Sequence, residues 1–269
     1  QIRAVMVNPI NALSKVIFVD SSQDKIGFRP EIARQLTPEI IKELKAEALR
    51  EMERYYSQEN SGVSLRAFFS RVMENYSQAK TEPFKGHPIG KLMRQDLPAE
   101  LKKLPFLKEN YYKVQGSVGQ GNWANVPWIA IMDTRITDTT RQGEYVVYLF
   151  SEDMKYLYLT LMQGVTVPLE QGRRQGYEYL KQKVREMRDL LPLENLMKDD
   201  QIYLTDSGIG RDYQLSTVGY IRYDRENMPD NETLISDLEN MIKNYSIYVH
   251  HHLGLHSLTG VKKENSNEK

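Results

Sequence analysis

Three glycines and both tryptophans of the chain lie within the segment 116–132, which reads GSVGQGNWANVPWIAIM. Glycines permit backbone conformations with positive φ and let the main chain approach a ligand closely. Pro127 argues against a helix after this loop, so we expect a strand that begins near Trp128. The segment therefore predicts a backbone loop beside an aromatic ring, a combination suited to binding a planar ligand.

A phosphate-cradling loop is a poor explanation of these glycines. Such loops lead into the N-terminus of a helix, whose free N–H groups bind the anion. The sequence GSVGQG is neither GxGxxG nor a Walker A loop, because no GK[ST] follows it. The plainer alternative is a strand-entry turn whose tryptophans fill the hydrophobic core.

Two further segments follow the loop in a fixed order. Residues 143–150 read GEYVVYLF, and residues 156–164 read YLYLTLMQG. Together with the glycine loop and its PW-containing strand, they resemble the N-terminal DNA-recognition domain of McrB-type restriction proteins. The resemblance extends over residues ~80 to 250 and rests on several linked segments instead of one short motif.

The resemblance implies a domain that binds double-stranded DNA carrying 5-methyl- or 5-hydroxymethylcytosine and flips the modified base into a pocket. In that family an AAA+ module hydrolyses GTP and a partner subunit carries the nuclease, so both are implied as partners. This sequence contains neither a Walker A motif nor an obvious PD-(D/E)xK pattern. We therefore expect a binding module, not an enzyme, with no cofactor.

The resemblance also assigns roles to individual residues. An aromatic pocket suits base flipping, because stacking on a ring, at about 1 to 3 kcal/mol per base, offsets the cost of unstacking. Each pocket candidate has an alternative role as plain core. The implied base-pocket residues are Trp128, Tyr145, Leu149 and Tyr213; the implied DNA loop is Gly119, Gln120, Gly121, Asn122 and Trp123; the implied phosphate contacts are Lys85, Lys91, Arg173 and Arg174.

The loop candidates differ in what they could do. Gln120 at the tip of the loop can hydrogen-bond the guanine left without a partner, but it stacks less well than an aromatic ring, so Trp123 competes for that role. Leu149 is the apolar contact expected for a methyl group. The phosphate contacts position the protein without specifying a base.

Composition gives no general electrostatic case for nucleic acid. Lys and Arg number 36, and Asp and Glu also number 36, so basic residues must act locally, as in 85–113 and 173–189. Cysteine is absent from the sequence, which excludes disulfides and thiolate chemistry. No charged leader and no long apolar run is present, and we expect a cytoplasmic protein without a membrane span.

The pattern of apolar residues predicts an α+β fold with a central mixed or antiparallel sheet flanked by helices. Helices are expected after Thr37, Ser64, Pro88, Gly172 and Asp230. Strands are expected around 145–150 and 155–161, each with aromatic side chains on one or both faces, and in the region 213–223. We divide the chain into an extension, 1–36, with a short strand at 15–19, a recognition domain, 37–256, and a polar tail, 257–269.

Two other classes of function remain open at this stage. A nuclease would need convergent carboxylates, and the sequence offers only a scattered set: Asp133, Asp138, Glu152 and Asp153. A protein-interaction module would use a tyrosine-rich sheet face left uncovered by helices. His87 is more simply a hydrogen-bonded structural residue than a catalytic one. A metal site is not expected among the histidines near 250–256.

Overall fold

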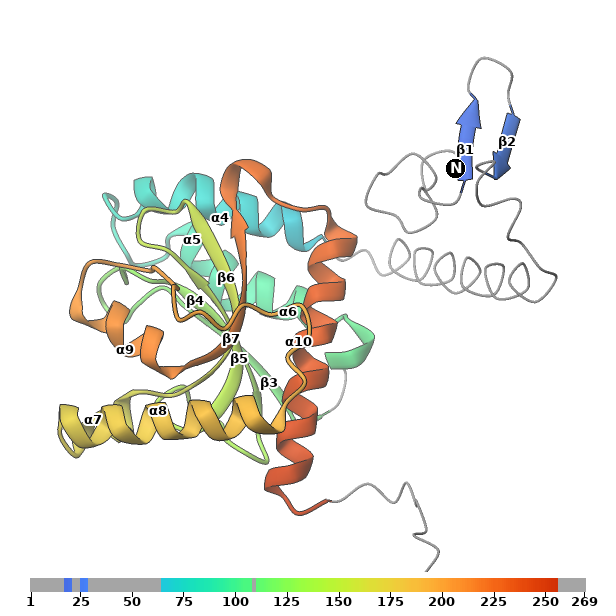
Figure 1. Cartoon of the computed structure of the whole chain (residues 1–269). Helices are drawn as coiled ribbons and strands as arrows, with labels where there is room; N and C mark the ends of the chain where they lie inside the picture. The colour runs from blue at the N-terminus through green and yellow to red at the C-terminus, as the bar shows by residue number, and fades with distance from the viewer. Residues whose placement is uncertain (1–16, 21–24, 29–63, 108–109, 256–269) are drawn as a thin grey trace, which may run out of the picture. The chain divides into compact units, whose positions relative to one another are not determined.

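The computed structural model describes residues 17–20, 25–28, 64–107 and 110–255, and the chain divides into two compact units, 1–62 and 63–269. In the first unit, β1 (Ile17–Asp20) pairs antiparallel with β2 (Lys25–Phe28), both blue in Figure 1. The first strand thus begins two residues after the predicted start at residue 15. The helix predicted after Thr37 and the predicted tail, 257–269, lie outside the described residues.

The second unit is built on a five-stranded sheet in which every pair of neighbouring strands is antiparallel. The strands follow one another in chain order, so the sheet is a meander (Figure 1). Helices flank this sheet, which confirms the α+β class. The strands are β3 (Tyr112–Ser117), β4 (Trp128–Asp133), β5 (Glu144–Phe150), β6 (Tyr156–Gln163) and β7 (Thr217–Asp224).

One face of the sheet is covered by the first and last helices of this unit. On α4 the predicted stripe is buried, with Phe69 and Tyr76 fully enclosed. The final helix begins where predicted, since the Asp230 carboxylate accepts a hydrogen bond from the Thr233 N–H at 2.9 Å. The helices of this face are α4 (Leu65–Ala79), α5 (Pro88–Lys91), η2 (Leu92–Asp96), α6 (Leu97–Leu101), η3 (Pro105–Leu107) and α10 (Asn231–His252).

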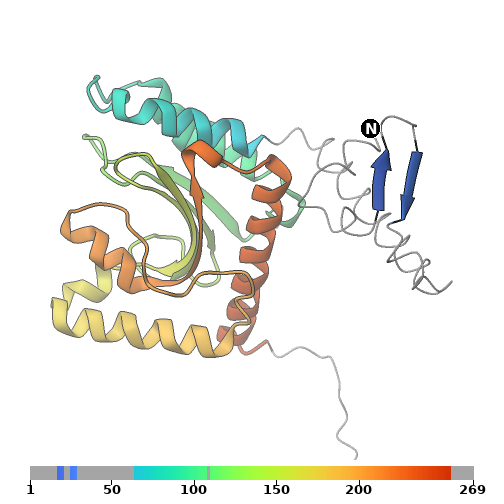
Figure 2. The same cartoon turned by 45° about the horizontal axis from the view of Figure 1, so that its top comes forward.

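The other helices are α7 (Thr166–Glu170), α8 (Arg173–Leu190), α9 (Gly208–Ser216) and the short turn η4 (Arg225–Asn227). Figure 2 shows the curved sheet between α4 on one side and α8 with α9 on the other. The strand predicted for 213–223 begins only at Thr217, because Tyr213 belongs to α9. The glycines at 208 and 210 indicated a turn, but the residues after them favour a helix.

Side chains alternate along β5 and β6 as the sequence predicts. Tyr148 and Leu159 belong to the apolar cluster under α4 and α10, and Tyr145 and Tyr158 belong to a second cluster on the opposite face. The tyrosine-rich face, on which the alternative protein-interaction function would depend, is partly covered. Ile202 and Leu204 belong to the cluster on this face, the Tyr203 N–H lies 3.4 Å from the Tyr158 hydroxyl, and Tyr158 is only 2% exposed. Within the described ranges, no helix combines the length and apolar character needed to cross a membrane.

Candidate nucleic-acid interface

The glycine loop between β3 and β4 is closed on itself. The Ala124 N–H donates to the Val118 carbonyl at 2.8 Å, and the Tyr76 hydroxyl donates to the Ala124 carbonyl at 2.8 Å. Gly119 has a φ of +105°, and a Cβ there would lie 2.0 Å from the Asn122 carbonyl oxygen. The loop therefore has a fixed shape, and its exposed tip consists of residues 120–122.

Trp123 does not point from this tip. Its indole Nε1 donates to the Glu82 carbonyl at 3.1 Å, and its ring packs edge-on against Phe84 and His87, each at a centroid distance of 5.1 Å. This geometry favours Gln120 over Trp123 as the residue placed toward the gap in the duplex. Trp123 fixes the loop to the turn after α4, because its indole N–H is bonded there and its ring packs against Phe84 and His87.

His87 has the structural role expected for it. Its Nδ1 accepts the Ile89 N–H at 3.1 Å and so caps α5, and its Nε2 lies 3.0 Å from the Glu82 carboxylate. Hydrogen bonds from Gln78 and His87 hold the pKa of Glu82 below its usual range. The turn that receives Trp123 is thus itself held in place by polar contacts.

Trp128 and Leu149 lie directly opposite each other in the pairing of β4 with β5. Both side chains belong to the second apolar cluster, together with Val126. Leu149 is 2% exposed, whereas Trp128 is only partly buried. The Trp128 ring is therefore accessible from solvent, next to the buried Leu149. It lies where the glycine loop ends and β4 begins.

Tyr145 lies on the same face of β5, four residues from Leu149, which corresponds to about 13 Å along a strand. Its hydroxyl donates to the Thr140 carbonyl at 3.0 Å. Burial raises the pKa of Tyr145, with a smaller contribution from the neighbouring Tyr213. The structure thus places the four predicted pocket residues on one face of the sheet as two pairs, Trp128 with Leu149 and Tyr145 with Tyr213.

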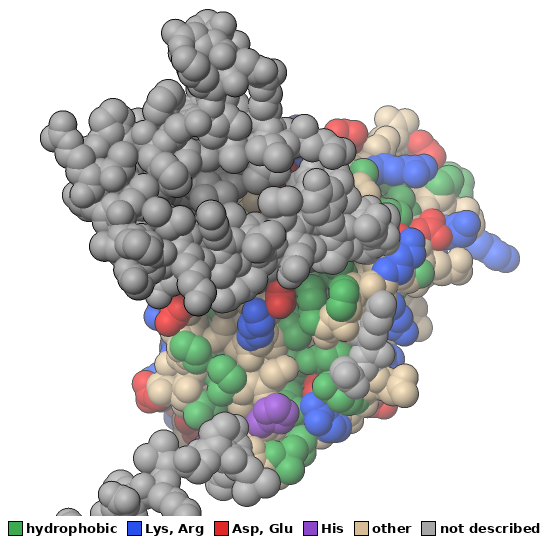
Figure 3. Space-filling view, turned by 90° about the vertical axis from the view of Figure 1, so that its right-hand side faces the viewer, with side chains coloured by type: hydrophobic (Ala, Val, Ile, Leu, Met, Phe, Trp, Pro, Cys, Tyr) green, Lys and Arg blue, Asp and Glu red, His purple; other side chains and the backbone are tan. Residues whose placement is uncertain are grey.

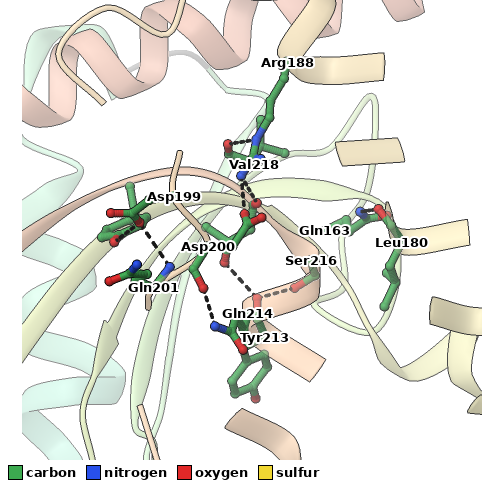
Figure 4. Close-up of polar contacts among 12 residues, drawn as sticks. Gln163, Leu180, Arg188, Asp199, Asp200, Gln201, Tyr213, Gln214, Ser216 and Val218 are labelled. Atoms are coloured by element: carbon green, nitrogen blue, oxygen red, sulfur yellow. Dashed lines mark hydrogen bonds and ion pairs between the residues drawn. The ribbon is translucent and has the colours of Figure 1, made fainter. Parts of the chain in front are cut away.

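Tyr213 reaches this face from α9, and Figure 4 shows its ring directed away from the polar network around the C-terminal end of that helix. The Tyr213 carbonyl accepts hydrogen bonds from Ser216 Oγ at 3.0 Å and Thr217 Oγ1 at 2.8 Å. Its position therefore depends on the junction between α9 and β7. The sequence placed this residue in a loose loop-to-strand region and gave no sign of the helix.

A polar network that the sequence did not reveal holds residues 197–205 across the second apolar cluster (Figure 4). Arg188 Nε donates to the Val218 carbonyl at 2.8 Å, and its Nη2 lies 2.6 Å from the Asp200 carboxylate. The Tyr220 hydroxyl donates to Asp199 at 2.6 Å and helps to hold the pKa of that carboxyl below its usual value. This network fixes the cover of the tyrosine-rich face.

The predicted phosphate contacts form two separate groups. Lys85 precedes α5 and Lys91 is its last residue; both are exposed, and Lys91 lies 3.9 Å from Asp96. Arg173 and Arg174 open α8, which Figure 1 shows well apart from α5. Arg173 donates to the Tyr177 hydroxyl at 2.9 Å, so it is partly engaged within the protein. The structure does not bring the four cations into one patch.

The surface on the α10 side of the molecule is mixed in character. The part visible in Figure 3 carries hydrophobic, basic and acidic side chains intermixed. A groove of about 500 Å³ lies there between η3 and α10, lined by Phe106, Tyr111 and the partly exposed Ile247. No single sign of charge dominates this visible face, so it gives no support to phosphate binding.

The scattered carboxylates have separate structural partners. Asp133 forms a two-point ion pair with Arg135 at 2.9 and 2.6 Å, and Asp153 accepts from Ser151 at 2.7 Å. Glu152 accepts from the hydroxyl of Thr205 and lies 3.7 Å from Lys80. In the part of the chain that the structure describes, no group of three or more His, Asp or Glu side chains is arranged to hold a metal ion.

Comparison with known families decides what this arrangement belongs to. The family described as MrcB-like, N-terminal domain, matches residues 71–250. The chain belongs to this family. The match covers more than half of the sequence and confirms the resemblance to McrB-type N-terminal domains. The MrcB-like N-terminal domain is a binding module associated with DNA targeting in restriction systems. No curated protein matches the chain.

Proposed function

We propose that this MrcB-like domain binds duplex DNA that carries a modified cytosine and accepts the flipped base on the face formed by β4, β5 and α9. The 5-position of cytosine lies in the major groove of a duplex, and extruding the base lets the protein contact that position on all sides. The recognised substituent is a 5-methyl or 5-hydroxymethyl group. The domain itself performs no chemistry on the DNA.

The single observation that carries this proposal is the pairing of Trp128 with Leu149. The partly exposed indole offers a stacking surface, and the adjacent buried leucine offers an apolar contact for a methyl group. Tyr145 lies four residues from Leu149 on β5, about 13 Å away along the strand, so Tyr145 and the partly buried Tyr213 are proposed to line a more distant part of the same face. A flipped base then replaces solvent above the Trp128 ring.

The glycine loop is proposed to approach the DNA at the flipped position. Its closed shape, held by Tyr76 and Trp123, presents Gln120 at the tip without the need to order a flexible segment. Gln120 can hydrogen-bond the guanine that loses its partner. Lys85, Lys91, Arg173 and Arg174 are proposed to contact phosphates on either side and to position the duplex.

Further partners belong to the same proposal. In a modification-dependent restriction system the DNA-reading domain works with an AAA+ GTPase module and a nuclease subunit, and we propose that this domain is the targeting part of such a system in the cytoplasm. The alternative, a protein-interaction module that uses an uncovered tyrosine face, has less support, because residues 202–204 pack over part of that face.

Base flipping has a direct optical test. A duplex with 2-aminopurine beside a 5-methylcytosine is titrated with the full chain, and emission of the probe is recorded. Flipping unstacks the neighbouring base, so we expect emission to rise on binding. A matched duplex with unmodified cytosine serves as the control. Saturable binding with unchanged emission in both duplexes would contradict flipping.

A further inference from the structure

A second site lies on the other face of the sheet and at the opposite end of β5 from Leu149. A cavity of about 330 Å³ opens there between the β4–β5 turn, α7 and α8. Its lining includes Glu144, Gln163 and Tyr179, the apolar side chains Ile136 and Val167, and the rim glutamines 142, 171 and 175. This volume lies at the lower end of the range typical of small-molecule sites.

Two polar side chains meet at the inner end of this cavity. Glu144, the first residue of β5, is paired directly with Gln163, the last residue of β6. Directly paired residues of antiparallel strands have Cβ atoms about 5 Å apart, so the two head groups can contact one small ligand. Glu144 is 5% exposed and Gln163 is 1% exposed.

The orientation of Gln163 is fixed by one hydrogen bond. Its Nε2 donates to the Leu180 carbonyl at 2.8 Å, which leaves its Oε1 as a buried acceptor with no partner among the described residues. The Tyr248 hydroxyl interacts with Glu144, and no cation lies within ion-pair distance of that carboxylate among the described residues. A buried acceptor without a donor is unfavourable, and a ligand that donates N–H groups would satisfy it.

The walls of the cavity are closely packed. A Cβ on Gly164 would lie 2.3 Å from the Gln142 backbone nitrogen, and one on Gly176 would lie 2.7 Å from the Pro168 carbonyl oxygen. Arg141 Nη2 and the Glu170 carboxylate, 2.7 Å apart, join the β4–β5 turn to α7. The cavity is therefore part of the fold and does not depend on a mobile loop.

We infer that this cavity is a binding site for a guanidinium group, which donates to the Glu144 carboxylate and the Gln163 Oε1 at the same time. A planar guanidinium has five N–H donors in a fork and no acceptor, which matches two neighbouring buried acceptors. Tyr179, 51% exposed at the rim, offers a ring for stacking. Ile136 and Val167 can line the aliphatic stem.

This site is independent of the proposed DNA function. Glu144 and Gln163 lie on the face opposite that of Trp128, and no residue is shared between the two. Lys183 is a cation that competes for Glu144. Although burial opposes the shift, the pKa of Lys183 is raised by its hydrogen bond to Glu186 at 3.1 Å and, to a smaller extent, by Glu144 and Tyr179. Removal of its charge in Lys183→Gln should therefore strengthen binding of a cationic ligand.

The test is a calorimetric titration of the full chain with three probes of similar size: ethylguanidinium, ethylammonium and neutral ethylurea. We expect saturable binding of one ethylguanidinium and weaker binding of both others, since only the guanidinium combines charge with a planar fork. Glu144→Gln should lower the affinity about tenfold or more. Glu178→Gln removes an exposed carboxylate from α8 outside the cavity and should leave the affinity unchanged.

A capped Gly-Arg-Gly peptide identifies the source of the group. Binding of the peptide at least as tight as that of ethylguanidinium assigns the site to an arginine side chain of a partner, and binding of the free probe alone assigns it to a small molecule. Equal losses in Glu144→Gln and Glu178→Gln would contradict the inference. If Glu144→Gln does not fold, titration of the unaltered chain with the three probes is decisive. The proposal is then overturned if ethylguanidinium binds no more tightly than ethylurea.

Discussion

Trp128 faces Leu149 across the β4–β5 ladder, and this pair joins a partly exposed aromatic ring to a fully buried methyl-bearing side chain. Neighbouring side chains on one face of an antiparallel pair are close enough to contact a single ligand together. The glycine loop ends immediately before this pair, so the loop and the ring belong to one small region of the surface.

Replacement of the ring should remove the preference for modified DNA. In Trp128→Ala the loss of base stacking, about 1 to 3 kcal/mol, should abolish the difference between modified and unmodified duplexes and leave a weak, salt-sensitive background. Trp128→Phe keeps an aromatic face and should retain part of the difference. Fluorescence anisotropy measures both. A large drop in the melting temperature of Trp128→Ala would instead identify the ring as core.

The shape of the glycine loop depends most strongly on Gly119. In Gly119→Ala the new Cβ would lie 2.0 Å from the Asn122 carbonyl oxygen at a φ of +105°, so the loop must rearrange. We expect a cost of more than about 1 kcal/mol in the free energy of unfolding, together with weaker DNA binding. Gly121→Ala is the matched control, because its Cβ meets nothing within 4 Å. Equal effects in urea unfolding would argue against this account.

The hydroxyl of Tyr76 supports the loop from below. Tyr76→Phe removes the donor to the Ala124 carbonyl and should lower stability by about 1 kcal/mol while weakening DNA binding. Tyr112→Phe removes a hydroxyl that contacts Ser246 at 3.2 Å, away from the loop, and should leave DNA affinity intact. Anisotropy titrations of the two variants distinguish a specific effect on the loop from a general loss of stability.

Salt dependence separates the phosphate contacts from the base site. Arg174→Gln should reduce the slope of log affinity against log salt by about 1 without changing the ratio between modified and unmodified DNA. Arg173→Gln should also reduce that ratio, because Arg173 holds Tyr177 and lies 3.7 Å from Asp212, next to Tyr213. If the two variants change the ratio of affinities for modified and unmodified DNA equally, Arg173 does not position Tyr213.

Asp237 should make stability depend on pH. Burial raises the pKa of Asp237, although a hydrogen bond from the Tyr223 hydroxyl at 2.9 Å opposes the shift. The folded state therefore holds this proton more tightly than the unfolded state, and the stability from that group is lost as pH rises through the folded pKa. Asp237→Asn should be more stable than the parent at pH 7 and indistinguishable from it below the ordinary Asp pKa. Urea unfolding from pH 7 down to below the ordinary Asp pKa measures the difference in free energy of unfolding between the two proteins. A difference that does not change with pH would contradict the prediction.

The sequence predicted the features that depend on local periodicity. The strands β5 and β6 and the helices after Ser64, Gly172 and Asp230 follow from residue spacing alone and are confirmed. The structural role of His87 was also predictable, because a polar residue before a proline favours a helix cap.

The sequence could not predict contacts between distant segments. The cover of the tyrosine-rich face by Ile202 and Leu204 depends on the Arg188–Asp200 pair and on Tyr220, which are far apart in the chain or lie in irregular structure. The anchoring of Trp123 at Glu82 likewise depends on a contact across 41 positions. Periodicity carries no information about such contacts, and for that reason neither the partial cover of this face nor the anchoring of Trp123 could be predicted.

The central claim is discrimination between modified and unmodified cytosine. It is tested most directly by anisotropy titrations of the full chain with one duplex in three forms, containing cytosine, 5-methylcytosine or 5-hydroxymethylcytosine, at a fixed salt concentration of about 100 mM. We expect a modified form to bind at least tenfold more tightly than the unmodified duplex, which corresponds to about 1.4 kcal/mol. Equal affinity for all three duplexes, or no binding to any, would contradict the claim.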